Sequence, residues 1–320
     1  MSIHIRRPDW YFYAAGHVLR KKVKVFDKLP YSDKKIISQD DMCKELKKRI
    51  AGTEPFMAAR VGFTEQAVMR IFEYRMTDKY EKIMNNLYNW SGFFPNDVSL
   101  GVRFTDMMKE YLKQVDLYAC NMEFLENYFM KKYLPKDSLS CKGFGIFDVF
   151  KLSDPWTAAL KGKKVLVILP FDKSVEHQYA RREKIYPGTD ILPEFELKTY
   201  KSQMTIGGMN EDGFKDWFEA LDHMNKDIEK IDFDIALVSC GAYAFPLCAH
   251  IKETGRQAIS VGGVLQIYFG ILGRRWDGSR FGGIEHMPEE LKPYYSDNWI
   301  YPLEERPAAA DGVEYGPYWK

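Results

Sequence analysis

The sequence has almost no net charge: 46 lysines and arginines stand against 45 aspartates and glutamates, which leaves a formal charge of +1 over 320 residues. A balance this even creates no overall field that would attract nucleic acid or a membrane surface. Any site for an anion must therefore be built locally. We expect no nucleic-acid partner.

Cysteine is scarce and follows no pairing pattern. The chain has five cysteines, an odd number, with no CxxC pair and no histidines at zinc-finger spacing. This pattern argues against a disulfide framework and against a structural zinc site. We expect reduced, mostly buried thiols.

Long apolar runs are also missing. The longest, Val261 to Leu272, is too short to cross a bilayer, and the first residues lack the apolar core and cleavage site of a signal peptide. The sequence predicts a cytoplasmic protein. Two interpretations stay open for the stretch WYFYAAGHVLRKKVKVF, residues 10–26: a surface helix that rests on anionic lipid at the inner face of the membrane, or a solvated arm docked on the core.

Two nucleotide-binding fingerprints are absent as well. The chain contains no GxGxxG motif at a strand-to-helix turn and no GxxxxGK[ST] loop. NAD and ATP therefore lose their strongest support.

What the chain does have, after residue 54, is an alternation of short β-branched runs with amphipathic helical stretches. Examples of the runs are PFMAARVG, KKVLVILPF, FDIALVSCG and QAISVGG. This alternation predicts an α/β fold with a Rossmann-like, mainly parallel sheet flanked by helices.

We divide the chain into three parts. Residues 1–53 form a basic, aromatic helical arm, residues 54–286 the Rossmann-like domain, and residues 287–320 an extended, aromatic-rich tail packed on that domain. Within the domain we expect a helix from about Thr64 to Met76, capped by Thr64. The stretch LYNWSGFFPND, residues 87–97, reads as a loop whose aromatic rings either pack beneath it or stack on a sugar.

Polar residues and glycines follow the predicted strands, at the turn into the next helix, which we call a corner. Ligands of parallel sheets gather at such corners. In the first, Arg60, Gly62, Thr64 and Glu65 place an acid in the first helical turn. The alternative is a plain helix start, where an acid favours the helix dipole.

Three later corners suit an anion. The second corner has polar residues that share or flank one helical face: Ser174, His177, Gln178 and Arg181. This face either binds an anion at the start of the helix or is an ordinary solvated, charged surface. The third corner contains Gly241 and Tyr243, and its glycine permits close approach of a phosphate to the backbone. The fourth corner contains Gly262, Gly263, Gln266, Arg274 and Arg275, and its arginines would clamp a diphosphate or form structural ion pairs.

Taken together, these stretches resemble the bacterial glycosyltransferases of the GT-D fold, a family first known as a domain of unknown function. The resemblance rests on ARVGFTE, PFDKSVEHQYARREK, DNWIYPLEE and above all the segment from Ser239 to Trp276. It implies a hexosyltransferase that takes a sugar from a nucleotide diphosphate sugar. The acceptor would be a hydroxyl of a glycan or lipid-linked saccharide in surface polysaccharide synthesis.

The family's first motif commonly runs Arg-x-Gly-Asp-Gly-Glu, with both acids around the donor's metal and phosphates. Here the arginine is Arg60 and the glutamate is Glu65, but Phe63 stands in place of the aspartate. The resemblance implies Glu65 and Arg60 as catalytic residues, with Glu65 as a base or as a ligand of Mn²⁺ or Mg²⁺. Phe63 makes that metal doubtful. It also leaves room for a degenerate member that binds a nucleotide or glycan as an assembly partner. A hydrolase that acts on a phosphorylated or nucleotide substrate is a third interpretation.

Overall fold

The structure is a computed structural model that describes residues 34–143, 149–152, 154–307 and 318–320, with residues 9, 11–13, 15, 16 and 18 of the N-terminal segment. Its centre is a sheet of eight strands in the order β1-β4-β3-β2-β8-β7-β5-β6, and every neighbouring pair is parallel. The strands are β1 (Lys35–Ile37), β2 (Met57–Ala59), β3 (Leu117–Cys120), β4 (Leu139–Lys142), β5 (Lys164–Leu169), β6 (Glu196–Lys201), β7 (Ile235–Val238) and β8 (Gln257–Ser260). The predicted α/β fold with a parallel sheet is confirmed.

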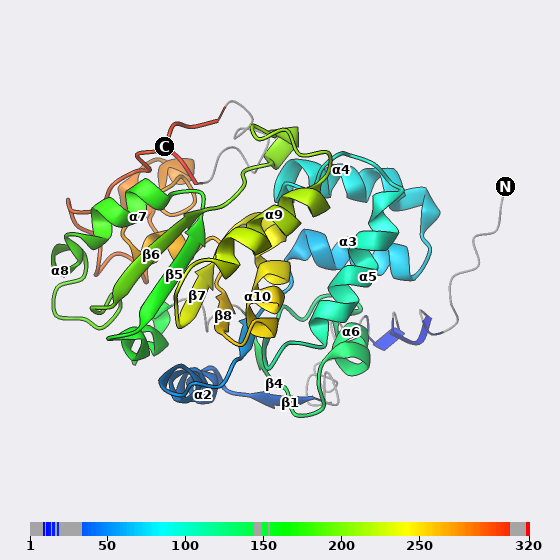
Figure 1. The fold of residues 1–320 in the computed structure, drawn as a ribbon, viewed down its shortest axis with the longest axis horizontal. Helices are drawn as coiled ribbons and strands as arrows, with labels where there is room; N and C mark the ends of the chain where they lie inside the picture. The colour runs from blue at the N-terminus through cyan, green and yellow to red at the C-terminus, as the bar shows by residue number, and fades with distance from the viewer. Residues whose placement is uncertain are drawn as a thin grey trace.

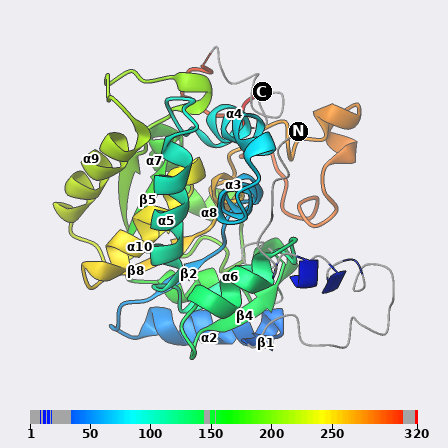
Figure 2. The same cartoon turned by 90° about the vertical axis from the view of Figure 1, so that its right-hand side faces the viewer.

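Helices cover both faces of this sheet. One face carries α3 (Phe63–Glu73), α4 (Tyr80–Ser91), α5 (Leu100–Leu112), α6 (Glu126–Tyr133), α9 (Trp217–Glu229) and α10 (Ala244–Glu253). The other carries α2 (Gln39–Ala51), α7 (Asp172–Tyr179), α8 (Arg182–Ile185), α11 (Leu265–Tyr268) and the C-terminal tail. In Figure 1, α9 and α10 lie in front of the sheet, and Figure 2 brings α5 and α6 toward the viewer.

The strands divide their side chains between two hydrophobic cores. In β5, Leu166 and Ile168 point into the core beneath α9 and α10, whereas Val165 and Val167 point into the opposite core. Successive residues of a strand face opposite sides, so a strand covered on both faces must be apolar throughout. This explains the unbroken β-branched runs in the sequence.

The sheet extends into the segment that we expected as an arm. β1 is an edge strand paired with β4, and α2 follows it with Ser38 as its N-cap, whose hydroxyl accepts a hydrogen bond from the Asp41 N–H. Of the basic and aromatic stretch, residues 10–26, the structure describes only residues 11–13, 15, 16 and 18, and Tyr13 packs edge to face on Tyr128 with ring centres 5.4 Å apart. The lipid interpretation stays a prediction.

Two local predictions were wrong. Thr64 does not cap α3: the N-cap is Gly62, which has no side chain, and Thr64 lies inside the first turn. The predicted loop over residues 87–97 begins as helix, because α4 continues to Ser91 before the chain turns at Gly92.

The described part of the C-terminal tail packs on the core beneath α11. Trp299 and Trp319 are buried there, and Ile300 forms a parallel β-bridge with Ile271. All five cysteines are free and buried, as predicted. Among the described residues, no helix has the length and apolar character needed to span a membrane.

Candidate functional site

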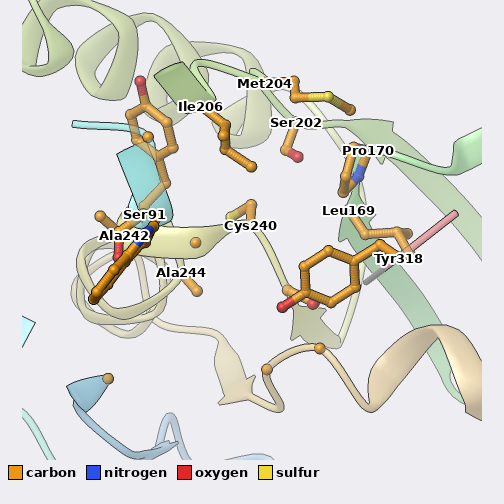
Figure 3. A pocket seen from close by; sticks show the side chains of 18 of the residues that line it. Ser91, Leu169, Pro170, Ser202, Met204, Ile206, Cys240, Ala242, Ala244 and Tyr318 are labelled. Carbon is orange, nitrogen blue, oxygen red and sulfur yellow. The ribbon is translucent and has the colours of Figure 1, made fainter. Parts of the chain in front are cut away.

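A cavity of about 560 Å³ opens at the carboxyl ends of β2, β5, β6, β7 and β8. Residues that follow these five strands line it, together with the end of α4 and the C-terminal residues Tyr318 and Trp319. Figure 3 looks into the cavity, with Ser91 on one side and Tyr318 on the other. Parallel sheets bind ligands at this end, because the loops that leave the strands converge there.

Glu65 lies in the first turn of α3 and is buried in the cavity wall, with 7% of its surface exposed. Burial raises the pKa of its carboxyl. Hydrogen bonds from its own backbone N–H and from the Ser91 hydroxyl, with the charge of Arg60, oppose that rise without cancelling it. A carboxyl with a raised pKa that faces a cavity is suited to proton transfer.

The glycine before this helix makes room for the carboxyl. A Cβ atom placed on Gly62 would lie 2.0 Å from Glu65 Oε2. Any larger residue at this position would therefore displace Glu65.

Arg60 directly follows β2 and lies between the first and fourth corners. Its guanidinium interacts with the charges of both Glu65 and Arg275, and burial lowers its pKa while Glu65 opposes that change. The guanidinium keeps its proton at any physiological pH. Gly262 faces it: a Cβ there would lie 2.3 Å from Arg60 Nη2, and its φ of +78° is one that side chains rarely adopt.

Arg275 forms the far side of the cavity with the C-terminal residues. Its Nη1 donates a hydrogen bond of 3.4 Å to the Tyr318 hydroxyl, and its guanidinium carbon lies 5.4 Å from the centre of that ring. The Arg274 N–H donates to the Trp319 carbonyl at 3.0 Å, which fixes the C-terminus in this place. Gly263 lines the cavity beside Tyr318, and Arg274 itself is not among the lining residues.

The third corner supplies the floor of the cavity. Gly241 has a φ of +58° and approaches the Ser91 carbonyl so closely that a Cβ would lie 2.8 Å from its oxygen. Tyr243 stacks on Trp217, with ring centres 4.8 Å apart, and its hydroxyl shares a hydrogen bond of 2.9 Å with Thr205. These residues shape the cavity through packing.

Gln266 also lines the cavity, but its amide is occupied. Its Nε2 donates to the carbonyls of Ile271 and Leu272 at 3.1 Å and to that of Tyr318 at 3.3 Å. The side chain therefore holds the fourth corner to the C-terminal residues.

The structure does not bring the second corner to the cavity. The start of α7, where we expected a phosphate, is occupied by the chain's own Glu304: its carboxylate accepts a hydrogen bond from the Ser174 N–H at 2.9 Å and another from the Ser174 hydroxyl. Gln178 and Arg181 donate to the Asn298 carbonyl, at 3.0 and 2.5 Å, and His177 is exposed. None of the four predicted residues of this corner lines the cavity.

A buried carboxylate supports the first corner from behind. Glu126, 2% exposed, accepts hydrogen bonds from Gln66 Nε2 and the Tyr118 hydroxyl at 2.8 Å, and from two backbone N–H groups. Gln66 Nε2 and Asn121 Nδ2 also donate to the Val61 carbonyl, at 3.2 and 3.1 Å. This network fixes the backbone between Arg60 and Glu65.

Trp90 belongs to the aromatic stretch for which the sequence left sugar stacking open, but other lining residues were not predicted, among them Ser91, Thr205 and Tyr318. They come from the end of a helix, from the loop after β6 and from the C-terminus, none of which shows a binding pattern in the sequence.

The lining residues do not form a protein-held metal site. Among the described residues, no group of three or more His, Cys, Asp or Glu side chains could hold a metal ion, and Glu65 is the only acid among those that line the cavity. A divalent cation such as Mg²⁺ or Mn²⁺ is usually bound by one or two carboxylates with substrate phosphates and water. Glu65 alone is a poor fit for this role.

Comparison with known proteins gives a family match and two similar solved structures. A family model described as a GT-D fold-like domain matches residues 37–268. Two solved structures are similar at 14% identity. The first is of "the highly conserved domain of unknown function 1792", described as having "a distinct glycosyltransferase fold", with a TM-score of 0.45 over 91% of this chain and 92% of that one. The second is a selenomethionine-substituted structure of the same domain, with a TM-score of 0.44 over 88% and 94% of the two chains. No curated protein matches the sequence.

Proposed function

The chain belongs to the family of GT-D fold-like domains, and from this premise we propose that it is a glycosyltransferase. It moves a sugar, in our proposal a hexose, from a nucleotide diphosphate sugar to a hydroxyl of a glycan or lipid-linked saccharide. The observation that carries the proposal is the joint placement of Arg60, Arg275 and Glu65 in one cavity at the carboxyl ends of the strands. Surface polysaccharide synthesis would be the setting.

The two arginines suit the donor's diphosphate. Sugar transfer breaks the bond between the sugar and the diphosphate, so negative charge grows on the departing oxygen and must be stabilised. Guanidinium groups bind phosphate oxygens through paired N–H donors. Arg60 and Arg275 interact with each other's charge, so both can face one diphosphate.

Glu65 suits the acceptor. A carboxyl whose pKa is raised by burial takes up a proton more readily than an exposed one. Glu65 would accept the proton of the acceptor hydroxyl as that hydroxyl attacks the sugar. Because the cavity does not fit a protein-held metal ion, we assign the charge of the diphosphate to the arginines.

The test is binding and turnover with a panel of nucleotide sugars, each with manganese and with EDTA. We expect one donor to stabilise the wild type against heat and to be hydrolysed slowly, with EDTA leaving both effects in place. Arg275→Ala should weaken donor binding about tenfold or more. Arg274→Ala is the matched control, because Arg274 neighbours Arg275 but does not line the cavity. This variant should bind the donor as the wild type does.

The outcomes separate the competing functions. Glu65→Ala should keep donor binding and lose turnover. Donor binding without turnover in the wild type, with acceptors present, would instead favour the non-catalytic assembly partner that Phe63 suggests. Rapid release of free sugar that no acceptor diverts would favour a hydrolase. No binding of any nucleotide sugar would refute the proposal.

A further inference from the structure

Two large aromatic side chains line the cavity and remain exposed. Phe63, the first residue of α3, is 53% exposed, and Trp90, near the end of α4, is 49% exposed. The next aromatic residues along the chain behave differently, since Phe93 and Phe94 are 0% and 5% exposed and belong to the core. The stretch after residue 87 therefore leaves Trp90 exposed in the cavity, half-buries Tyr88 and buries Phe93 and Phe94.

The exposed rings belong to the same two helices that position the acid. The Ser91 hydroxyl donates to the Glu65 carboxyl, so the start of α3 meets the end of α4 at this point. Phe63 precedes Glu65 by two residues, and Trp90 directly precedes Ser91. Both rings therefore line the cavity from the same two helix ends that hold the carboxyl.

The cationic groups lie toward the other side. Arg60 interacts with the charges of both Glu65 and Arg275, and Arg275 contacts Tyr318, which lies across the cavity from Ser91 (Figure 3). The order across the cavity is therefore Arg275 with Tyr318 on one side and the end of α4, which carries Ser91 and Trp90, on the other.

This order distinguishes the two substrates. If the diphosphate lies against the arginines, the hydroxyl that gives its proton to Glu65 approaches from the side of Phe63 and Trp90. The face of an aromatic ring carries partial negative charge, which attracts the C–H groups of a sugar ring and repels a phosphate. Binding sites use such rings as apolar walls with a few polar groups for orientation.

We propose that Phe63 and Trp90 form the acceptor subsite, where the terminal sugar ring of the acceptor stacks beside Glu65. The inference rests on the proposed function. It assigns the aromatic pair to the acceptor and leaves the nucleotide to the remainder of the cavity.

The experiment measures two ligands separately on the full chain. Uridine, guanosine and thymidine diphosphates are titrated by calorimetry, and the one that binds best is then kept saturating while an array of mono- and oligosaccharides is probed. The variants are Phe63→Ala, Trp90→Ala and the double variant. Phe281→Ala, which removes a 75% exposed ring outside the cavity lining, is the matched control, and Phe63→Tyr with Trp90→Phe keeps both rings.

We expect each truncation to weaken glycan binding about fivefold or more, the double variant to weaken it further, and diphosphate affinity to change less than about twofold. The ring-keeping variant and Phe281→Ala should bind glycan as the wild type does. If the alanine variants lose affinity for the nucleoside diphosphate, the inference is overturned, because the rings would then stack on the nucleobase of the donor. If diphosphate binds but the wild type binds no glycan, or the double variant binds glycan as the wild type does, the acceptor subsite is overturned and the proposed function stands. Failure of every diphosphate to bind would instead refute the proposed function itself.

Discussion

Substitution of Gly62 by alanine tests whether the observed position of Glu65 is the one that the reaction uses. The backbone at Gly62 has φ −64° and ψ 158°, which alanine adopts without strain. The new Cβ would, however, lie 2.0 Å from Glu65 Oε2, and real Cβ atoms essentially never approach another heavy atom within 3.0 Å. The carboxyl must therefore move by about 1 Å or more, the difference between these two distances.

A displacement of this size is large for catalysis and small for folding. Misplacement of a reacting group by about 1 Å can reduce the rate on the order of 100-fold. We expect Gly62→Ala to lose about that much turnover of the best donor, measured by release of nucleoside diphosphate. The free energy of unfolding, measured in urea, should change by less than about 1 kcal/mol, because only a side chain shifts and the backbone stays in place.

Gly52→Ala provides the control. Gly52 also has an ordinary φ of −77°, and a Cβ there would meet the Arg49 carbonyl at an ordinary 3.4 Å. It is not among the residues that line the cavity. It should leave turnover unchanged. Full turnover in Gly62→Ala would refute the assignment of Glu65 in its present position, and a loss of stability above about 3 kcal/mol would show that the backbone had moved instead.

Three further substitutions test the charges and the backbone. Glu65→Gln should abolish turnover but stabilise the protein at pH 8. Burial raises the pKa of Glu65, so the stability that this group contributes is present in acid and is lost as the pH rises through its folded-state pKa. Thermal unfolding should therefore show a smaller gain in stability at pH 4.5 than at pH 8. Glu73 is the opposite case: burial raises its pKa, but hydrogen bonds from Tyr128 and a lysine with nearby positive charge outweigh this and lower it to about 2. Glu73→Gln should therefore cost about 1 to 3 kcal/mol at pH 7 after screening, and less as the pH falls from 4.5 toward 2, in urea titrations at each pH. Gly241→Ala should destabilise more than Gly162→Ala in guanidinium titrations, since both have positive φ, which costs alanine about 1 to 2 kcal/mol, but only the Cβ at Gly241 meets a backbone oxygen at 2.8 Å.

The central sheet was predictable because its strands are covered on both sides. The run from Val165 to Leu169 has no polar position, and a parallel strand between two helical layers requires that pattern. The edge of the sheet was not predictable in this way. β1 has three residues with no buried side chain, and β4 includes the buried hydroxyl of Ser140, so neither shows a period or an apolar run.

The corners of the site differ in how local their geometry is. Glu65 reaches the cavity because of Gly62 and the first turn of its own helix, all within a few residues, so the sequence could indicate it. The start of α7 depends on Glu304, which arrives 130 residues after Ser174 and accepts its hydrogen bonds. No local pattern distinguishes a helix start that awaits a phosphate from one that the chain's own carboxylate already occupies.

Phe63 connects the two proposals through charge. With an aspartate at this position, as the family's motif commonly has, the first corner would carry two acids against Arg60, and a dication would be needed before a diphosphate could approach. With Phe63 the corner holds one acid, Glu65, beside one arginine, and Arg275 adds a second positive charge across the cavity. If the family's aspartate is a metal ligand, as the resemblance implies, then Phe63 removes both that ligand and the negative charge that a metal would have neutralised. In its place stands an exposed ring that lines the same cavity as the carboxyl, where we propose that the acceptor sugar stacks.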